Sequence, residues 1–315
     1  MTDNQQSTKT EKFSLANLRD PIIIGGVFYI VAVVLWLATG HLFYLFNFVY
    51  IGTSIVLGIG LFAALPRKKK NIGRKVAQFL VGGYMLIFLG LIQRENMQLE
   101  GFFFYLLSGL FAGSVIHYLV AKVFGPLIFN RGWCGWACWT AAVLDLMPFN
   151  RKLPGRHPIL GRLRFIHFFA SLVLVFVLWF ILDYRPGSQS NHELYWLLAG
   201  NAFYYLTAIA LAIGFKDNRA FCKYLCPIPT LQKITSRFSL LKISGPAEDC
   251  TNCGACVRAC PMDIRVSDYI QNNQRVLSSE CIFCLECVNA CPHQILDTSF
   301  AFDFAWQENL RYQDK

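Results

Sequence analysis

Long apolar stretches fill most of residues 21–215, and short polar stretches separate them. A helix needs about 20 consecutive apolar residues to cross the hydrocarbon core of a bilayer. The first two apolar stretches meet at Gly40-His41, which indicates a tight helical hairpin. In all, the pattern predicts six transmembrane helices, over residues 21–40, 42–65, 76–92, 102–122, 165–182 and 194–215.

The composition is that of a membrane protein rather than of a soluble domain. Apolar residues make up 55% of the chain, charged residues only 15%, and the mean hydropathy is +0.41. Residues 1–20 are polar and mixed in charge, unlike a cleavable signal peptide. We therefore expect a polar tail over residues 1–20 and a first apolar stretch that remains as a transmembrane helix.

Positive charge lies mainly in loops between the apolar segments, and the formal net charge is +10. Loop 66–75 has six Lys and Arg residues and no acid, and segment 121–164 has seven against Asp145 alone. The alternate loops, 93–101 and 183–193, have one each. Because Lys and Arg favour the cytoplasmic side, we expect a multi-pass protein of the bacterial inner membrane with both termini cytoplasmic. The basic residues form no stripe on a soluble fold, so lipid rather than nucleic acid is the expected partner.

Two features of the predicted membrane part differ from a simple series of spanning helices. The segment Leu127–Phe149 is apolar and aromatic but lies between two ends that are both expected to be cytoplasmic. We expect an interfacial or partly re-entrant helix there, with its three tryptophans at headgroup depth. In the fourth predicted helix, Gly109 and Gly113 have the spacing that lets two helices pack closely.

Eight of the twelve cysteines form two copies of one pattern near the C-terminus. In such a pattern, three thiolates wrap around three corners of a cubane iron–sulfur cluster, and the fourth, which precedes a proline, ligates the other cluster. The two copies are Cys250-x2-Cys253-x2-Cys256-x3-Cys260-Pro261 and Cys281-x2-Cys284-x2-Cys287-x3-Cys291-Pro292.

The doubled pattern predicts two [4Fe–4S] clusters with crossed ligands. Disulfides are disfavoured on the cytoplasmic side, where thiols stay reduced, and zinc sites use pairs of ligands instead of a doubled run of four. Residues 246–295 resemble the bacterial two-cluster ferredoxins, so we expect a small α+β domain over residues 246–300 and a tail over 301–315. The expected ligands are Cys250, Cys253, Cys256 and Cys291 for cluster 1, and Cys281, Cys284, Cys287 and Cys260 for cluster 2.

The remaining cysteines form two CxxxC pairs whose surroundings repeat. The stretches 130–138 and 218–226 share Asn, Arg and both cysteines at the same positions, and aromatic residues match at two more. Free cysteines rarely repeat together with their neighbours, so a shared role is indicated. The four residues are Cys134, Cys138, Cys222 and Cys226.

Each of these pairs also follows a predicted hairpin of helices. The first helix of the hairpin starts 58 residues before Cys134 and 57 residues before Cys222. We predict that residues 76–138 and 165–226 are parallel hairpin repeats, related by a pseudo-two-fold axis along the membrane normal. Such an axis brings two loops at the same depth together, and residues i and i+4 of a helical turn share a face. The four thiols are therefore expected to bind one metal centre.

Three interpretations of these four cysteines stay open. A third [4Fe–4S] cluster is favoured, and a copper or other soft-metal site, or a redox-active dithiol, comes second because thiolates also suit Cu(I). Buried cysteines that only pack are the third interpretation. Arg131, Arg219 and Lys223 are expected to lower the pKa of the thiols and to offset cluster charge.

Over residues 76–295, the helices, the CxxxC pairs and the two-cluster motif together resemble the membrane-bound ferredoxin-type (polyferredoxin) family. This family includes the NapH-type quinol dehydrogenase subunit of periplasmic nitrate reduction, with relatives in nitrous oxide respiration and in copper handling during cytochrome oxidase assembly. The family's transmembrane motif is CxxxCP. Cys222-x3-Cys226-Pro227 matches it, whereas Cys138 is followed by Trp139.

The resemblance implies an oxidoreductase module that passes electrons between the quinone pool and a redox partner protein through cytoplasmic clusters. The alternative is a metal reductase, for example for Cu(II), or another assembly factor for a respiratory enzyme. A passive scaffold that anchors a soluble redox partner is a third hypothesis. The predicted fold is a membrane all-α domain over residues 21–245, followed by the ferredoxin domain.

Three polar residues in or near the predicted helices are candidates for lesser roles. His117 and His167 are candidate ligands of a bis-histidine haem, although a hydrogen bond to quinone or between helices is favoured. Asp145 lies beside the first CxxxC pair and is expected to cap a helix or to lie at the surface.

Overall fold

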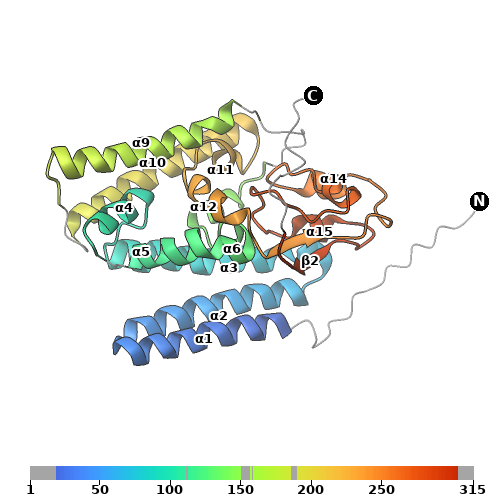
Figure 1. The fold of residues 1–315 in the computed structure, drawn as a ribbon, viewed down its shortest axis with the longest axis horizontal. Coiled ribbons are helices and arrows are strands. Elements are labelled where there is room, and N and C mark those ends of the chain that lie inside the picture. The colour runs from blue at the N-terminus through green and yellow to red at the C-terminus, as the bar shows by residue number, and fades with distance from the viewer. Residues whose placement is uncertain (1–18, 111–112, 150–156, 158, 186–189, 304–315) are drawn as a thin grey trace, which may run out of the picture. The chain divides into compact units, whose positions relative to one another are not determined.

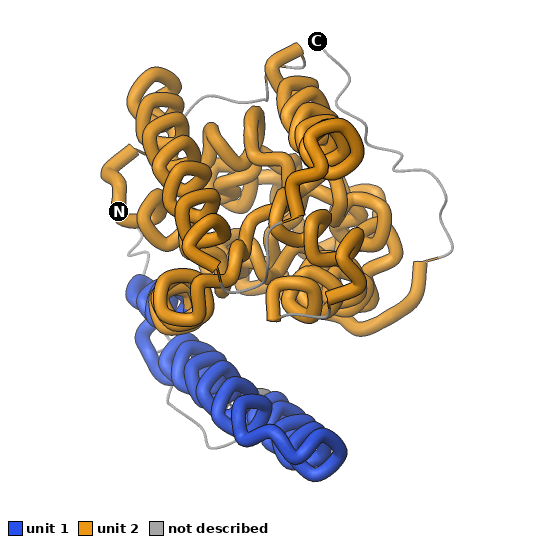
Figure 2. The backbone as a smooth tube through the Cα atoms, turned by 90° about the vertical axis from the view of Figure 1, so that its left-hand side faces the viewer, with its two compact units in different colours: residues 1–77 blue, residues 78–315 orange. Residues whose placement is uncertain are grey.

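The chain falls into two compact units, residues 1–77 and residues 78–315 (Figure 1, Figure 2). All twelve cysteines belong to the second unit. The computed structural model describes residues 19–110, 113–149, 157, 159–185 and 190–303.

The first unit is a helical hairpin followed by the start of a third helix. Gly40 and His41 join the two long helices, and Gly40 has a φ of 70°, which glycine adopts without steric cost. The start of the third helix packs closely on the second, because a Cβ at Gly58 would overlap the Cβ of Ala77. The elements are α1 (Arg19–Thr39), α2 (Leu42–Ala64), η2 (Arg67–Lys69) and the first half of α3 (Asn71–Tyr84).

Five helices are long and apolar enough to cross a membrane, among the residues that the structure describes. They are Pro21–Thr39, Leu42–Ala64, Arg67–Ile92, Leu160–Ile181 and Asn191–Phe215. Within the second unit these spans contain the end of α3, η3 (Met85–Ile92), η5 (Leu160–Arg162), α9 (Leu163–Phe176), η6 (Val177–Ile181) and α10 (Asn191–Phe215). The chain thus carries several helices of the membrane-spanning type.

The helix predicted over residues 102–122 is interrupted. Its first part ends where the backbone N–H of Leu110 donates to the carbonyl of Tyr105 and Gly109 adopts a φ of 67°. Gly109 therefore serves a turn, and the prediction that Gly109 and Gly113 form a packing motif on one helix is wrong. A shorter apolar helix, Gly113–Phe129, follows the turn. The elements are α4 (Leu99–Leu107), α5 (Gly113–Tyr118), η4 (Leu119–Phe124) and α6 (Gly125–Phe129).

The segment 127–149 is not one interfacial helix but a series of short ones. Asn130, with a φ of 55°, ends α6, and α7 (Gly132–Trp136) and α8 (Trp139–Leu144) follow. The indole of Trp136 donates to the carbonyl of Phe283 at 2.9 Å, and that of Trp139 to Asn201 at 3.0 Å. These two tryptophans therefore bond inside the protein, contrary to their expected place among lipid headgroups.

The C-terminal part of the second unit is a small α+β domain. Its strands β1 (Leu241–Ser244) and β2 (Asp297–Phe300) pair antiparallel, with Leu241 opposite Phe300. Strand β1 begins before the expected boundary at residue 246, and Ile243 on it belongs to the core of the domain. The helices of this domain are α13 (Ala255–Ala259), α14 (Val266–Gln271) and α15 (Glu286–Ala290), and two further helices precede it, α11 (Ala220–Tyr224) and α12 (Ile228–Ser236).

Candidate metal centres

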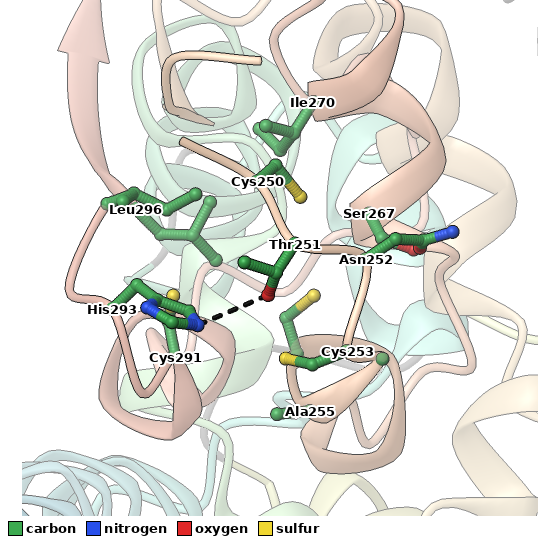
Figure 3. Close-up of a pocket in the computed structure, with 13 residues that line it drawn as sticks. Cys250, Thr251, Asn252, Cys253, Ala255, Ser267, Ile270, Cys291, His293 and Leu296 are labelled. Atoms are coloured by element: carbon green, nitrogen blue, oxygen red, sulfur yellow. Dashed lines mark hydrogen bonds between the residues drawn. The ribbon is translucent and has the colours of Figure 1, made fainter. Parts of the chain in front are cut away.

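The first set of expected cluster ligands lines one hollow of about 340 Å³, here called the outer cavity (Figure 3). Helix α13 contributes Cys256, and Cys291 directly follows α15. A hydrogen bond of 3.2 Å between Thr251 and His293 joins the two loops at its edge. The four cysteines of the outer cavity are Cys250, Cys253, Cys256 and Cys291.

The second set lines another hollow, of about 360 Å³, here called the inner cavity. The backbone N–H of Ile264 donates to the sulfur of Cys260 at 3.4 Å. The four cysteines of the inner cavity are Cys260, Cys281, Cys284 and Cys287. Each cavity thus receives three cysteines from one motif and the fourth from the other, which is the crossed arrangement that the spacing predicts.

The two cysteine loops have the same backbone, 31 residues apart. Left-handed φ values occur at Asn252 and Gly254 in the first loop (50° and 69°) and at Phe283 and Leu285 in the second (50° and 62°). Residues with a Cβ adopt this conformation at a cost of about 1–2 kcal/mol each. The tight left-handed turns between the cysteines curl each loop, so that successive thiols face one cavity instead of alternating in direction.

Burial makes the thiols of the inner cavity hard to ionise by themselves. Burial, together with the charge of Cys284, raises the pKa of Cys281 to about 12, and burial raises the pKa of Cys260 to about 11. A coordinated thiol is deprotonated by its metal. Four such thiols around a hollow therefore fit a group that carries its own positive charge, as the iron atoms of a cluster do. None of the twelve cysteines, all of which lie in the described part of the chain, forms a disulfide.

The two CxxxC pairs have matching local structures. Cys134 and Cys222 are each the third residue of a five-residue helix, α7 and α11, and an arginine immediately precedes each helix. Cys138 and Cys226 lie beyond the ends of these helices. The sequence led us to expect both cysteines of a pair on one helical face. Instead, the first cysteine lies inside a short helix and the second follows the residue that ends this helix.

The two pairs lie close together, in what is called here the four-thiol site. One nitrogen of the Arg219 guanidinium lies 3.4 Å from the carbonyl oxygen of Cys134 and 4.0 Å from the sulfur of Cys222. Burial raises the pKa of Cys222 to about 11 against the lowering effect of Arg219, and the charges of Cys138 and Cys134 add to the rise. Each thiol is thus within electrostatic reach of thiols of the other pair.

Several buried donors around the four-thiol site have no hydrogen-bond partner among the described residues. They include Nε and Nη2 of Arg131, Nε of Arg219 and the amide nitrogen of Gln232, whose oxygen lies 3.2 Å from the sulfur of Cys134. The two guanidinium groups also carry positive charge. Buried donors normally find acceptors, and the sulfide and thiolate sulfurs of an anionic cluster accept hydrogen bonds. The residues present therefore fit an iron–sulfur cluster.

The four-thiol site directly adjoins the inner cavity. A Cβ at Gly135, between Cys134 and Cys138, would overlap the carbonyl oxygen of Ile282. The backbone N–H of Arg131 donates to the carbonyl of Cys281 at 3.2 Å. The first CxxxC loop and the second ferredoxin loop therefore touch backbone to backbone.

Buried ion pairs surround this contact. Glu280, next to Cys281, accepts from Arg131, Arg164 and Lys233, and the two arginines are almost fully buried. Near the second CxxxC pair, Lys223 bonds Asp217 at 2.7 Å and Asp263 at 2.6 Å. The sequence offered only a weak sign of Glu280, an acid that stands immediately before the cysteine motif.

His117, His167 and Asp145, the other candidate residues, each contact a different part of the protein. His117 packs its ring on Trp133, with centroids 4.9 Å apart, whereas His167 bonds the carbonyl of Leu225 at 2.9 Å. Asp145 is not at the surface but forms a buried ion pair with Arg219 at 2.6 Å. In the described part of the chain, no three His, Cys, Asp or Glu side chains are placed to hold a single metal ion. A cluster differs in this respect, because its own iron and sulfide atoms separate the thiols.

Comparisons with known families agree with the cysteine sites. A 4Fe–4S dicluster domain matches residues 242–292, and a 4Fe–4S binding domain matches two segments, residues 111–156 and 202–246. Each of these two segments contains one CxxxC pair. The prediction of 4Fe–4S ferredoxin-type domains is thereby confirmed.

Three relatives illustrate the range of similar proteins. An uncharacterised protein of Methanocaldococcus jannaschii is 29% identical over 64% of this chain and 78% of its own length. YccM of Escherichia coli, named as an electron transport protein, is 28% identical over 49% of this chain and 47% of its own length. The methylamine utilization ferredoxin-type protein MauN of Paracoccus denitrificans is 28% identical over 50% of this chain and 59% of its own length. No solved structure matches.

Proposed function

We propose that this iron–sulfur electron-transfer protein with membrane-spanning helices passes electrons between the quinone pool and a soluble redox partner. Cys250, Cys253, Cys256 and Cys291 would hold one [4Fe–4S] cluster, Cys260, Cys281, Cys284 and Cys287 a second, and Cys134, Cys138, Cys222 and Cys226 a third. Bound clusters supply one-electron redox chemistry. The names of YccM and MauN, which refer to electron transport and to ferredoxin, support this class of function.

The observation that carries the proposal is the serial arrangement of the three sites within the second unit. The four-thiol site lies beside membrane-type helices, since Arg219 follows α10 and Trp139 bonds Asn201 on that helix. Gly135 touches the inner cavity, and at the outer cavity Cys253 is exposed to solvent. A route of this kind has one end among apolar helices, where a lipid-soluble carrier dissolves, and the other in water, where a soluble partner can dock.

The protein itself holds and insulates the sites. Arg131 and Arg219 place two buried positive charges beside the four thiols, which stabilises an anionic group there. Buried contacts such as that of Gly135 with Ile282 exclude water between the sites. Both CxxxC segments match the family of 4Fe–4S binding domains, which supports iron rather than copper at the third site.

The test is the reduction of the purified protein by a quinol. Full-length protein in lipid nanodiscs, incubated without oxygen with decylubiquinol or menaquinol, should lose part of its visible iron–sulfur absorbance. About twelve iron atoms per chain are expected for three clusters. About eight iron atoms with bound copper would support a metal reductase instead, and a lack of any response to quinols or quinones would contradict the proposal.

The proposal also includes a cytoplasmic location of the clusters, based on the Lys and Arg content of the loops. A fusion of alkaline phosphatase to the C-terminus should then be inactive in a bacterial host, whereas a fusion at loop 183–193 should be active. High activity of the C-terminal fusion would overturn this orientation.

A further inference from the structure

One face of α9 brings two polar groups from other helices together inside the membrane part of the second unit. His167 and Ser171 on α9 are four residues apart, so they lie on the same face at a separation of about 6 Å along the axis. Ser171 donates to Glu100 of α4 at 2.6 Å. The ring of His167 packs edge-on against Tyr204 of α10, with centroids 5.7 Å apart. Glu100 and Tyr204 therefore contact α9 at two positions that are one helical turn apart.

Both groups have hydrogen-bonding capacity that the described protein does not use. Oε2 of Glu100 and the hydroxyl of Tyr204 are buried and have no partner among the described residues. Tyr204 is only 8% exposed. An unsatisfied buried polar group costs about 1–3 kcal/mol, so a tyrosine and a carboxylate left in this state point to a ligand.

The same face of α9 is connected to the four-thiol site. Nδ1 of His167 lies 2.9 Å from the carbonyl oxygen of Leu225, the residue just before Cys226. The ring of Tyr204 also packs against Phe221, with centroids 5.4 Å apart, and Phe221 immediately precedes Cys222. A ligand that bonds Tyr204 and Glu100 would thus lie next to the second CxxxC pair, on its membrane side.

We propose that Glu100 and Tyr204 bind the head group of a quinol, with Ser171 holding Glu100 and His167 orienting Tyr204. A quinol presents two hydroxyl groups on opposite sides of an apolar ring. The free carboxylate oxygen of Glu100 accepts from one hydroxyl, and the hydroxyl of Tyr204 bonds the other. Neighbouring aromatic side chains suit the apolar ring of the quinol. One of them is Phe203, whose ring centroid lies 5.8 Å from that of His167.

This site makes a specific prediction about the two redox forms of the ligand. A carboxylate accepts a hydrogen bond from a hydroxyl, but it has no proton to offer a carbonyl. Glu100 should therefore favour the reduced form over the oxidised one. The inference rests on the proposed exchange with the quinone pool and names the residues that would perform it.

The experiment measures equilibrium binding of tritiated decylubiquinol to the full-length protein in nanodiscs, without oxygen and corrected with protein-free nanodiscs. Glu100→Gln and Tyr204→Phe should each weaken quinol binding by about tenfold, the loss of one hydrogen bond to a buried group. Glu100→Gln should change the binding of decylubiquinone by less than about threefold. Ser171→Ala, which keeps the charge of Glu100, should give a smaller loss.

Two matched controls are available on α10. Glu193→Gln alters another buried glutamate, which bonds Tyr105 at 3.1 Å, and Tyr195→Phe alters a tyrosine that is 64% exposed. Both should bind quinol within about twofold of the unaltered protein. Iron content shows whether each variant is folded. If Glu100→Gln or Tyr204→Phe loses iron, the binding of quinol to Ser171→Ala decides: weaker binding supports the inference, and unchanged binding contradicts it.

The outcomes separate the inference from the proposed function. If the unaltered protein binds quinol but Glu100→Gln and Tyr204→Phe bind it equally well, the site lies elsewhere and the inference is wrong, while quinone exchange stands. The same holds if Glu193→Gln alone abolishes binding. If the unaltered protein shows no saturable binding of quinol, the proposed function fails and the inference with it.

Discussion

The inner and outer cavities are built from equivalent loops but differ in their surroundings. Both loops have two left-handed positions between their cysteines, and both cavities take a fourth cysteine from the partner motif. The inner cavity is flanked by Gly135, Arg131 and the buried Glu280. The outer cavity ends at the exposed Cys253.

This difference assigns distinct tasks to two otherwise similar sites. The inner loop is a docking element, because its backbone and the preceding Glu280 bond the CxxxC region. The outer loop retains an exposed edge, at which a water-soluble protein can approach. The two copies of the motif thus differ in the parts of the chain that surround them and not in their ligands.

The largest effect is expected from replacing the fourth cysteine of each motif. Cys260→Ser should remove the cluster of the inner cavity although Cys260 belongs to the first motif, and Cys291→Ser should remove that of the outer cavity. Iron content should fall by about four atoms in each variant, and paramagnetic resonance spectra of the reduced proteins should lose different signals. Loss of the outer signal in Cys260→Ser would contradict the crossed assignment.

The next effect concerns the docking of the inner loop. Glu280→Gln leaves the buried side chains of Arg131 and Arg164 without their anionic partner. We expect a destabilisation of about 3–5 kcal/mol, as for other broken buried ion pairs, measured by chemical unfolding in detergent. Glu248→Gln, at an exposed position of the same domain, is the control and should be neutral. Equal stability of the two variants would show that the ion-pair cluster does not hold the contact.

A smaller effect is expected from adding one methyl group to the contact between the two loops. Gly135→Ala would place a Cβ against the carbonyl of Ile282, and the loops would have to separate. Overpacking of this kind costs about 1–3 kcal/mol, again measured by chemical unfolding. Gly83→Ala, where a Cβ meets nothing within 4 Å, should not destabilise the protein. A neutral Gly135→Ala would mean that the two loops are not in tight contact.

The smallest effect is expected away from the inner cavity, close to the two strands of the C-terminal domain. Burial acts to raise the pKa of Asp303, but hydrogen bonds from Arg275 and Lys242 outweigh it and hold this pKa below its usual 3.8. The stabilisation is therefore present above the usual pKa and is lost as the pH falls through the lower, folded value. Asp303→Asn should cost about 1 kcal/mol at pH 7, and the difference from the unaltered protein should vanish in acid. A difference that persists in acid would exclude this ionic origin.

Local sequence determined the parts of the protein whose partners lie nearby along the chain. The spacing of Cys281, Cys284 and Cys287 already implies a loop around a hollow, because two intervening residues leave few ways to turn. The long apolar stretches likewise implied membrane helices, since a helix satisfies its own backbone groups in lipid. The repeat of Arg and Cys around Cys134 and Cys222 pointed to matching local structures, which α7 and α11 have.

Only the tertiary structure decided what those parts contact. The break at Gly109 was hidden because apolar side chains continue through the turn, and hydropathy does not register a change of direction. Residues far apart in the chain are joined by the ion pair of Asp145 with Arg219 and by the contact of Gly135 with Ile282. The contacts of α9 with Glu100 and Tyr204 are of the same kind. Such pairs leave no periodic trace in one sequence, because each partner alone satisfies no pattern until the fold brings them together.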